Sequence, residues 1–192
     1  KPEFRGKICV RSSTNVYNQS LLASIVEHIG EAAAEKWVKG VVANFARKPE
    51  GNDTTQIEAV AAGECELSIV NSYYLARYIG AEDGKMRMIG SKVGFLFPNQ
   101  RTSGTHVNVS GAGVARHAPN PENAETLIAF LLSGEAQQTF AAGNNEYPVV
   151  EGVAPTGPVA EFGAFRADDV DMTALGQHQA QAVRIFDKAG WQ

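Results

Sequence analysis

Three tyrosines lie where the sequence pattern changes from strand to helix: Tyr17, Tyr73 and Tyr74. A phenol has a pKa of about 10, so it loses its proton at neutral pH only beside a strong positive charge. Ferric ion supplies that charge, phenolate is a hard anionic oxygen donor, and three phenolates would neutralise Fe³⁺. A single tyrosine at a helix start is usually packing with a wet hydroxyl. Two adjacent helical tyrosines cannot both face a core, so the pair favours a metal site.

Arg77 follows Tyr73 by four residues and Tyr74 by three, which places it on the same helical face. Its guanidinium could donate to a phenolate, or it could be an ordinary solvated arginine. The segment before Tyr17 is rich in polar side chains, namely Arg11, Ser12, Ser13, Thr14 and Asn15. With the free backbone N–H groups of a helix start, this segment suits a small oxyanion. It suits a helix cap equally well.

Alternating strands and helices must position these side chains. Short apolar strands are predicted at residues 7–11 and 65–70, and helices at residues 17–29, 31–46, 54–62 and from about 71 onward. Asp53 is predicted to cap the third of these helices. This order predicts an α/β fold with a parallel-type sheet flanked by helices. Since the carboxyl ends of parallel strands share one edge, where ligands bind, Tyr17 should lie near Tyr73 and Tyr74.

The second half of the chain follows a looser pattern. Residues 86–97 alternate as one long strand that ends at Pro98, and residues 105–115 alternate as another. Helices are predicted at residues 121–132, with Asn120 as the cap, at 134–142 and at 173–189.

Composition excludes some classes of function. The chain has 192 residues, 44% of them apolar, and a net charge of −4 from 17 Lys+Arg and 21 Asp+Glu. Nucleic-acid binding needs a basic stripe, so no nucleic-acid partner is predicted. The chain has no Walker lysine, no Gly-x-Ser-x-Gly elbow and no two-histidine, one-carboxylate face. We therefore predict that the protein is not an enzyme.

The cysteines and histidines give weaker signals. Cys9 and Cys65 lie in short apolar runs. They could be two buried thiols, or a disulfide between neighbouring strands, which requires an oxidising compartment. The four histidines show no metal-ligand spacing, and His28 is predicted to be an ordinary surface residue.

Five stretches of the chain resemble the ferric-iron-binding, substrate-binding proteins of bacterial ABC importers. They are residues 11–21, 60–69, 71–77, 104–113 and 143–148, and the most specific is the paired tyrosine of Asn-Ser-Tyr-Tyr-Leu-Ala-Arg at 71–77. The resemblance implies a type II periplasmic-binding-protein fold, with two α/β lobes, a hinge, and iron held in the cleft. It implies that Tyr73 and Tyr74 are the paired ligands and that Tyr17 is the third tyrosine of a subgroup using three or more. Arg77 matches an arginine that lies just behind the ligands in some members.

By the same resemblance, the chain corresponds to the C-terminal portion of these longer proteins. Residues 1–95 and 155–192 would form the C-terminal lobe with the tyrosine cluster, and residues 96–154 would cross the hinge into the other, mostly missing, lobe. The protein would be exported to the periplasm, act as a monomer, and deliver iron to an ABC permease in the inner membrane.

The resemblance also bears on an accompanying anion, because family members pair iron with phosphate or carbonate, or use neither. Phosphate-using members carry an asparagine where this chain has Asp53, whose negative charge would repel phosphate. Carbonate held by Arg11, Ser12, Ser13 and Asn15, or no anion, is therefore expected. The alternative function is a binding protein for a small oxyanion or organic acid, in which the Arg11-Ser12-Ser13 loop binds the ligand and the tyrosines are only walls.

Overall fold

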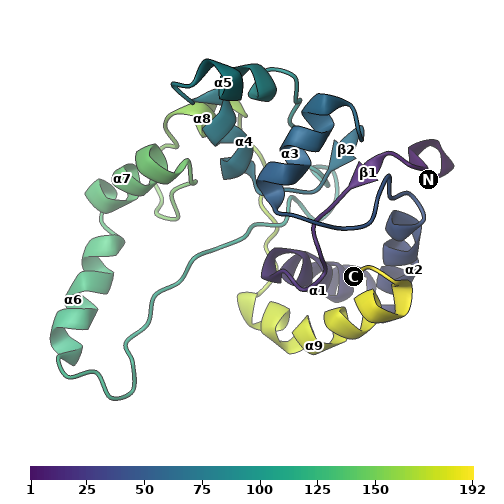
Figure 1. The fold of residues 1–192 in the computed structure, drawn as a ribbon. Coiled ribbons are helices and arrows are strands. Elements are labelled where there is room, and N and C mark those ends of the chain that lie inside the picture. The colour runs from purple at the N-terminus through teal and green to yellow at the C-terminus, as the bar shows by residue number, and fades with distance from the viewer.

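The computed structural model describes all residues 1–192 and has an α/β fold rich in helix (Figure 1). In chain order its elements are a 3₁₀ helix at Pro2–Phe4, β1 Ile8–Cys9, α1 Val16–Ile29, α2 Glu31–Val42, α3 Asp53–Ala62, β2 Leu67–Ser68, α4 Ser72–Ile79, α5 Gly84–Gly90, α6 Pro121–Leu131, α7 Gly134–Asn144, α8 Pro158–Glu161 and α9 Met172–Ala189. The predicted fold class is confirmed, and the helices before Gly80 lie within a few residues of their predicted positions. α8 was not predicted.

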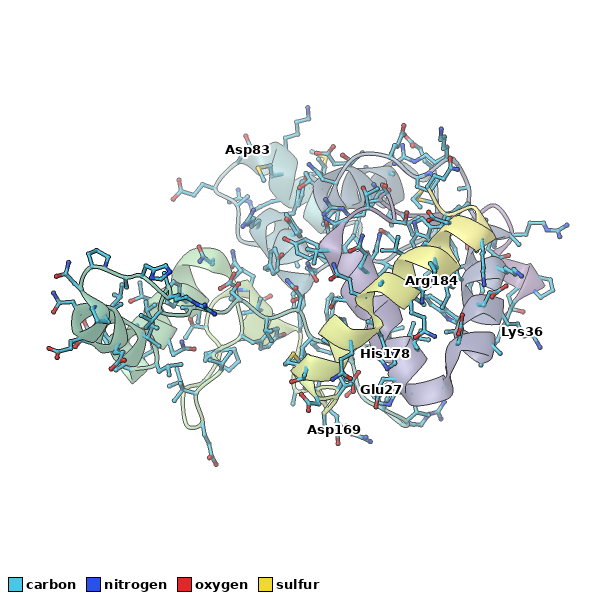
Figure 2. All side chains as sticks on the ribbon, turned by 90° about the horizontal axis from the view of Figure 1, so that it is seen from below. Glu27, Lys36, Asp83, Asp169, His178 and Arg184 are labelled. Atoms are coloured by element: carbon cyan, nitrogen blue, oxygen red, sulfur yellow. A yellow bond between two sulfur atoms is a disulfide. The ribbon has the colours of Figure 1, made fainter.

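The largest apolar core lies among α1, α2 and α9, which pack on one another. Its buried helical side chains recur three or four residues apart, as a helix with one apolar face requires: Leu22, Val26, Ala34, Val38, Ala182, Ile185 and Phe186. Val10, after β1, and Trp191, after α9, complete the core. Burying each large apolar side chain contributes roughly 1.5–3 kcal/mol. At the rim of this core, Nε2 of His178 on α9 lies 2.8 Å from Oε2 of Glu27 on α1 (Figure 2).

The sheet consists of β1 and β2, which pair in parallel with Ile8 opposite Leu67 and Cys9 opposite Ser68. Cys9 and Cys65 form a disulfide with their Cα atoms 5.9 Å apart, which decides between the two alternatives left open by the sequence. Because the two strands run in the same direction, the segments that follow them emerge at the same edge of the sheet. Those segments lead into α1 and α4.

Two predicted strands in the second half are wrong. Within residues 86–97, the chain instead forms the end of α5, which Asp83 caps with its side chain. After α5, Phe95 stacks on Phe162 with ring centroids 4.0 Å apart. This segment therefore packs through aromatic side chains instead of pairing in a sheet. The predicted strand at 105–115 makes only a single bridge, between Thr105 and Ala167, because no further strand lies beside it.

Helix boundaries differ from prediction where the chain makes other contacts. α2 ends at Val42 rather than at residue 46, because Phe45 forms a bridge to Ile8 and the backbone N–H of Ala46 donates to the Ile8 carbonyl at 2.8 Å. α6 begins after Asn120 as predicted, although the Asn120 side chain makes no capping hydrogen bond.

α6 and α7 lie away from the α1–α2–α9 core, at the end of a long stretch without regular structure (Figure 1). Large apolar side chains on and beside these two helices are exposed, among them Leu127, Phe130, Leu132 and Phe140. Exposed apolar groups of this size normally contact another part of a protein. The assignment of residues 96–154 to a second lobe stays a prediction.

Candidate metal centre

Tyr17 is held at the start of α1 by the segment that follows β1. The side chain of Asn15 caps this helix by accepting from the backbone N–H of Tyr17 at 2.9 Å. The Arg11 guanidinium lies over the Tyr17 ring, 5.4 Å from its centroid. The Arg11 carbonyl in turn accepts from the indole N–H of Trp191 at 3.0 Å, so the whole segment is anchored to the core.

Tyr73 and Tyr74 occupy the first turn of α4, directly after β2. Their ring centroids are 4.5 Å apart with the planes tilted by 39°, and both side chains are only partly buried. Arg77, one turn further along, places its guanidinium 5.7 Å from the Tyr73 centroid and 5.2 Å from the Tyr74 centroid. The arginine therefore lies on the same face as both tyrosines, as its spacing indicates.

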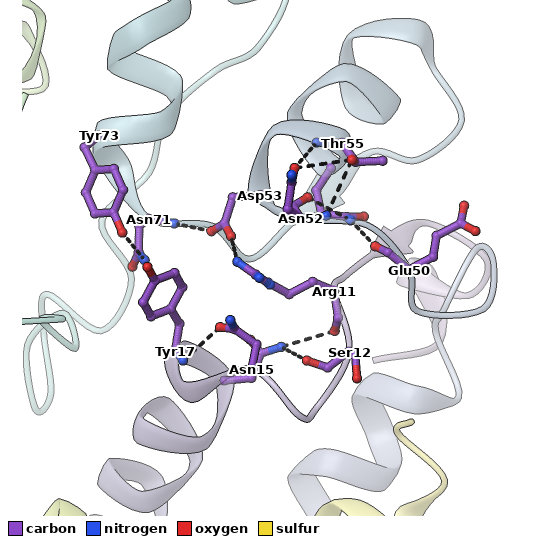
Figure 3. A network of polar contacts seen from close by, with 12 residues as sticks. Arg11, Ser12, Asn15, Tyr17, Glu50, Asn52, Asp53, Thr55, Asn71 and Tyr73 are labelled. Carbon is purple, nitrogen blue, oxygen red and sulfur yellow. Dashed lines mark hydrogen bonds and ion pairs between the residues drawn. The ribbon is translucent and has the colours of Figure 1, made fainter. Parts of the chain in front are cut away.

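The three phenol groups meet although they come from two separate segments of chain. Figure 3 shows the Tyr17 and Tyr73 side chains extending from different helices toward one another. Burial raises the pKa of Tyr73 well above its usual range, and a hydrogen bond with Tyr17 raises it further. Burial and the same Tyr17 hydroxyl also raise the pKa of Tyr74. The raised pKa values of Tyr73 and Tyr74 favour their protonated forms, and a strongly charged cation beside the two phenols would oppose this shift.

A polar network behind the tyrosines was not predicted. Asp53 was expected to cap α3, but Asn52 is the cap and accepts from the backbone N–H of Thr55 at 3.1 Å. The Asp53 carboxylate is instead buried, pairs with the Arg11 guanidinium, and accepts from the backbone N–H of Asn71 at 3.0 Å.

Asn71 extends this network to the cluster, because its side-chain Nδ2 donates to the Tyr73 oxygen at 3.0 Å (Figure 3). Sequence reasoning did not assign Asn71 a role of its own. The sequence did carry a signal for Asp53. The preceding residue, Asn52, can also cap the helix, and a cap supplied by Asn52 leaves the Asp53 side chain available for another contact.

Three of the four polar side chains predicted to hold an anion, those of Arg11, Ser12 and Asn15, make contacts within the protein. Arg11 pairs with Asp53, and Ser12 Oγ lies 2.9 Å from Thr14 Oγ1 and accepts from the Thr14 backbone N–H at 3.2 Å. Asn15 is the cap of α1. Ser13 is buried. The structure therefore brings the tyrosines together, makes Asn15 the cap of α1, and gives Arg11 and Ser12 partners within the protein.

His28 is exposed, as predicted, but it also has a specific partner, since its Nε2 lies 2.8 Å from Oδ1 of the buried Asp168. Asp168 also accepts from the Ser24 hydroxyl at 2.6 Å, and His106 Nε2 lies 2.6 Å from the Ser20 hydroxyl. These contacts join α1 to the bridged segments around Thr105 and Ala167. No group of three or more His, Cys, Asp or Glu side chains is arranged to hold a metal ion, which leaves the tyrosines as the clustered donors.

The chain belongs to a family of bacterial extracellular solute-binding proteins, which its residues 1–161 match. Its relatives include iron uptake protein A1 of Synechocystis, 49% identical over 190 residues, with 99% of this chain and 53% of the relative covered. The major ferric iron-binding protein of Neisseria meningitidis serogroup B is 28% identical, with 98% of this chain and 55% of the relative covered. None of the helices is both long enough and apolar enough to span a membrane.

Solved structures of similar proteins share the fold. One is FutA (IdiA) of Trichodesmium in complex with iron and citrate ligands, 48% identical with a TM-score of 0.97, covering 100% of this chain and 61% of that one. Another is ferric iron-binding protein A of Mannheimia haemolytica in an open conformation, 38% identical with a TM-score of 0.94, covering 100% of this chain and 60% of that one. The chain thus has a type II periplasmic-binding-protein fold and spans little more than half the length of these relatives.

Proposed function

We propose that the protein binds ferric ion through the phenolates of Tyr17, Tyr73 and Tyr74 and delivers it to an ABC importer. The observation that carries the proposal is the meeting of three phenol groups from two segments of chain. Ferric ion is a hard trivalent cation, and three phenolates would match its charge. The printed names of the relatives, which include iron uptake and ferric iron-binding proteins, support the same cargo.

The arrangement of lobes is part of this proposal. Residues 1–95 and 155–192 would form the lobe that carries the tyrosines, and residues 96–154 would contribute to a second lobe that closes over the metal. The exposed apolar side chains of α6 and α7 support this assignment. Closure would exclude water from the metal, and the closed form of the protein would bind the permease. Release would follow protonation of the phenolates, or transfer of one electron from an external reductant to give Fe²⁺, because either step weakens attraction between the metal and its oxygen ligands.

A periplasmic location fits the Cys9–Cys65 disulfide, since disulfides persist in oxidising compartments. An additional carbonate would have to bind beside Arg11, Ser12, Ser13 and Asn15. Because the Arg11 charge is balanced by Asp53, we expect iron affinity to be the same with and without bicarbonate. The protein would act as a monomer without nucleic acid, and as a carrier it would catalyse no reaction.

Titration with ferric citrate tests the proposal, because phenolate donates charge to Fe³⁺ and gives a visible charge-transfer band. We expect Tyr73→Phe or Tyr74→Phe to remove the band and weaken binding by more than about hundredfold, which exceeds the usual effect of a residue behind a metal ligand. Tyr17→Phe should weaken binding less.

Tyr78→Phe is the matched control, because Tyr78 lies on the same helix but its hydroxyl donates a hydrogen bond to Glu58 at 2.6 Å. It should leave the band and the affinity unchanged. Colour and affinity retained in both the Tyr73 and Tyr74 variants would reject the proposal.

A further inference from the structure

Asn71 makes an unusual contact for its position. It is the N-cap residue of α4, where an asparagine normally accepts a hydrogen bond from a backbone N–H two or three residues ahead. The Asn71 side chain makes no such bond. Its Nδ2 instead donates to the hydroxyl oxygen of Tyr73 at 3.0 Å (Figure 3).

The backbone of Asn71 is held by a separate hydrogen bond. Its N–H donates to Asp53 at 3.0 Å, and Asp53 is itself buried and paired with Arg11. This chain of contacts joins the segments after β1 and β2 and leaves Asn71 little freedom to turn. Its amide is therefore held in place toward the Tyr73 oxygen before any metal arrives.

We propose that Asn71 is a positioning residue for the Tyr73 ligand, holding the phenol oxygen in the direction of the cluster and donating a hydrogen bond to it when iron is bound. The inference rests on the proposed function. A phenolate oxygen has lone pairs for both a metal and a donor, and hydrogen bonds to charged acceptors are stronger than neutral ones. Residues that orient metal ligands typically change metal affinity by about 10–100-fold when replaced.

Two substitutions remove the amide in different ways. Asn71→Leu keeps a side chain of similar size but removes the hydrogen-bond donor. Asn71→Ser keeps a good N-cap residue, but its side chain is too short to reach the Tyr73 oxygen. Asn120→Leu is the matched control, since Asn120 is also an N-cap residue whose side chain makes no capping bond, and it is exposed far along the chain at α6. Thermal unfolding of each iron-free variant shows whether it folds.

Each variant is titrated with ferric citrate. We expect Asn71→Leu and Asn71→Ser to weaken iron binding by about tenfold or more and to move the charge-transfer band to longer wavelength, because a phenolate that loses a hydrogen bond donates charge more easily. Asn120→Leu should change neither. A purely structural role would not move the band, and if Asn71→Leu fails to fold, Asn71→Ser decides.

A second arm measures iron affinity alone after Asn71 is replaced in the Tyr73→Phe background, where the acceptor oxygen is absent and the substitution should weaken binding little further. Unchanged affinity and band energy in a folded Asn71 variant would overturn the inference, as would an equal loss of iron affinity in the wild-type and Tyr73→Phe backgrounds. Absence of any band in the wild-type protein would instead reject the proposed function.

Discussion

Removal of the Cys9–Cys65 disulfide should lower the free energy of unfolding by about 4 kcal/mol. The bond joins residues 56 apart in the chain, and a cross-link of that length restricts the unfolded chain by about 14 cal/mol/K in the loop-entropy description, which is about 4 kcal/mol at 25 °C. Domains are typically stable by about 5–15 kcal/mol, so the loss would be a large fraction of the total. For a chain of this size it corresponds to a lower melting temperature by about 8–16 °C.

Urea unfolding of the wild type and of the Cys9→Ala/Cys65→Ala double variant measures this difference. Reductant should lower the stability of the wild type to near that of the double variant, and it should not affect the variant. A thiol assay on the unfolded wild type confirms that the bond is present before reduction. A loss below about 1 kcal/mol with the bond intact would show that the unfolded chain is already restricted by other contacts, and the reasoning from loop length would fail.

Asp53→Ala should cost about 3–5 kcal/mol in urea unfolding, because it leaves Arg11 without its buried partner; a loss under about 1 kcal/mol would show that water replaces the carboxylate. Burial lowers the pKa of His106, and the charge of Asp168 opposes part of this shift. The imidazole therefore binds a proton more tightly in the unfolded chain than in the folded protein. Stability from this residue is therefore complete above the ordinary histidine pKa of 6.5 and decreases as pH falls below it. Melting temperatures from pH 7.5 downward should fall less steeply in His106→Gln than in the wild type, and equal slopes would contradict the argument.

The position of the tyrosine cluster could be predicted because it follows from topology. Two apolar strands, each followed by a helix, must run in parallel and open at one edge, which brings Tyr17 to Tyr73 and Tyr74. The disulfide could not be settled in this way, since it depends on how close Cys9 in β1 comes to Cys65, which lies just before β2.

The contacts behind the cluster could not be predicted, because each joins residues far apart in sequence. Asp53 pairs with a residue 42 positions away and His28 with one 140 positions away, and local patterns carry no information on such pairs. The strand predicted at residues 86–97 is wrong for a different reason. Its alternating apolar residues fit a strand, but Asp83 caps a helix there and no neighbouring strand is available.

The central claim is that tyrosines lose their protons to a bound ferric ion. Ultraviolet difference spectroscopy at neutral pH, recorded while ferric citrate is added, counts ionised tyrosines against the iron that the protein binds. We expect three ionised tyrosines for each ferric ion in the wild type and two in Tyr17→Phe. Iron bound with no ionised tyrosine would contradict the account.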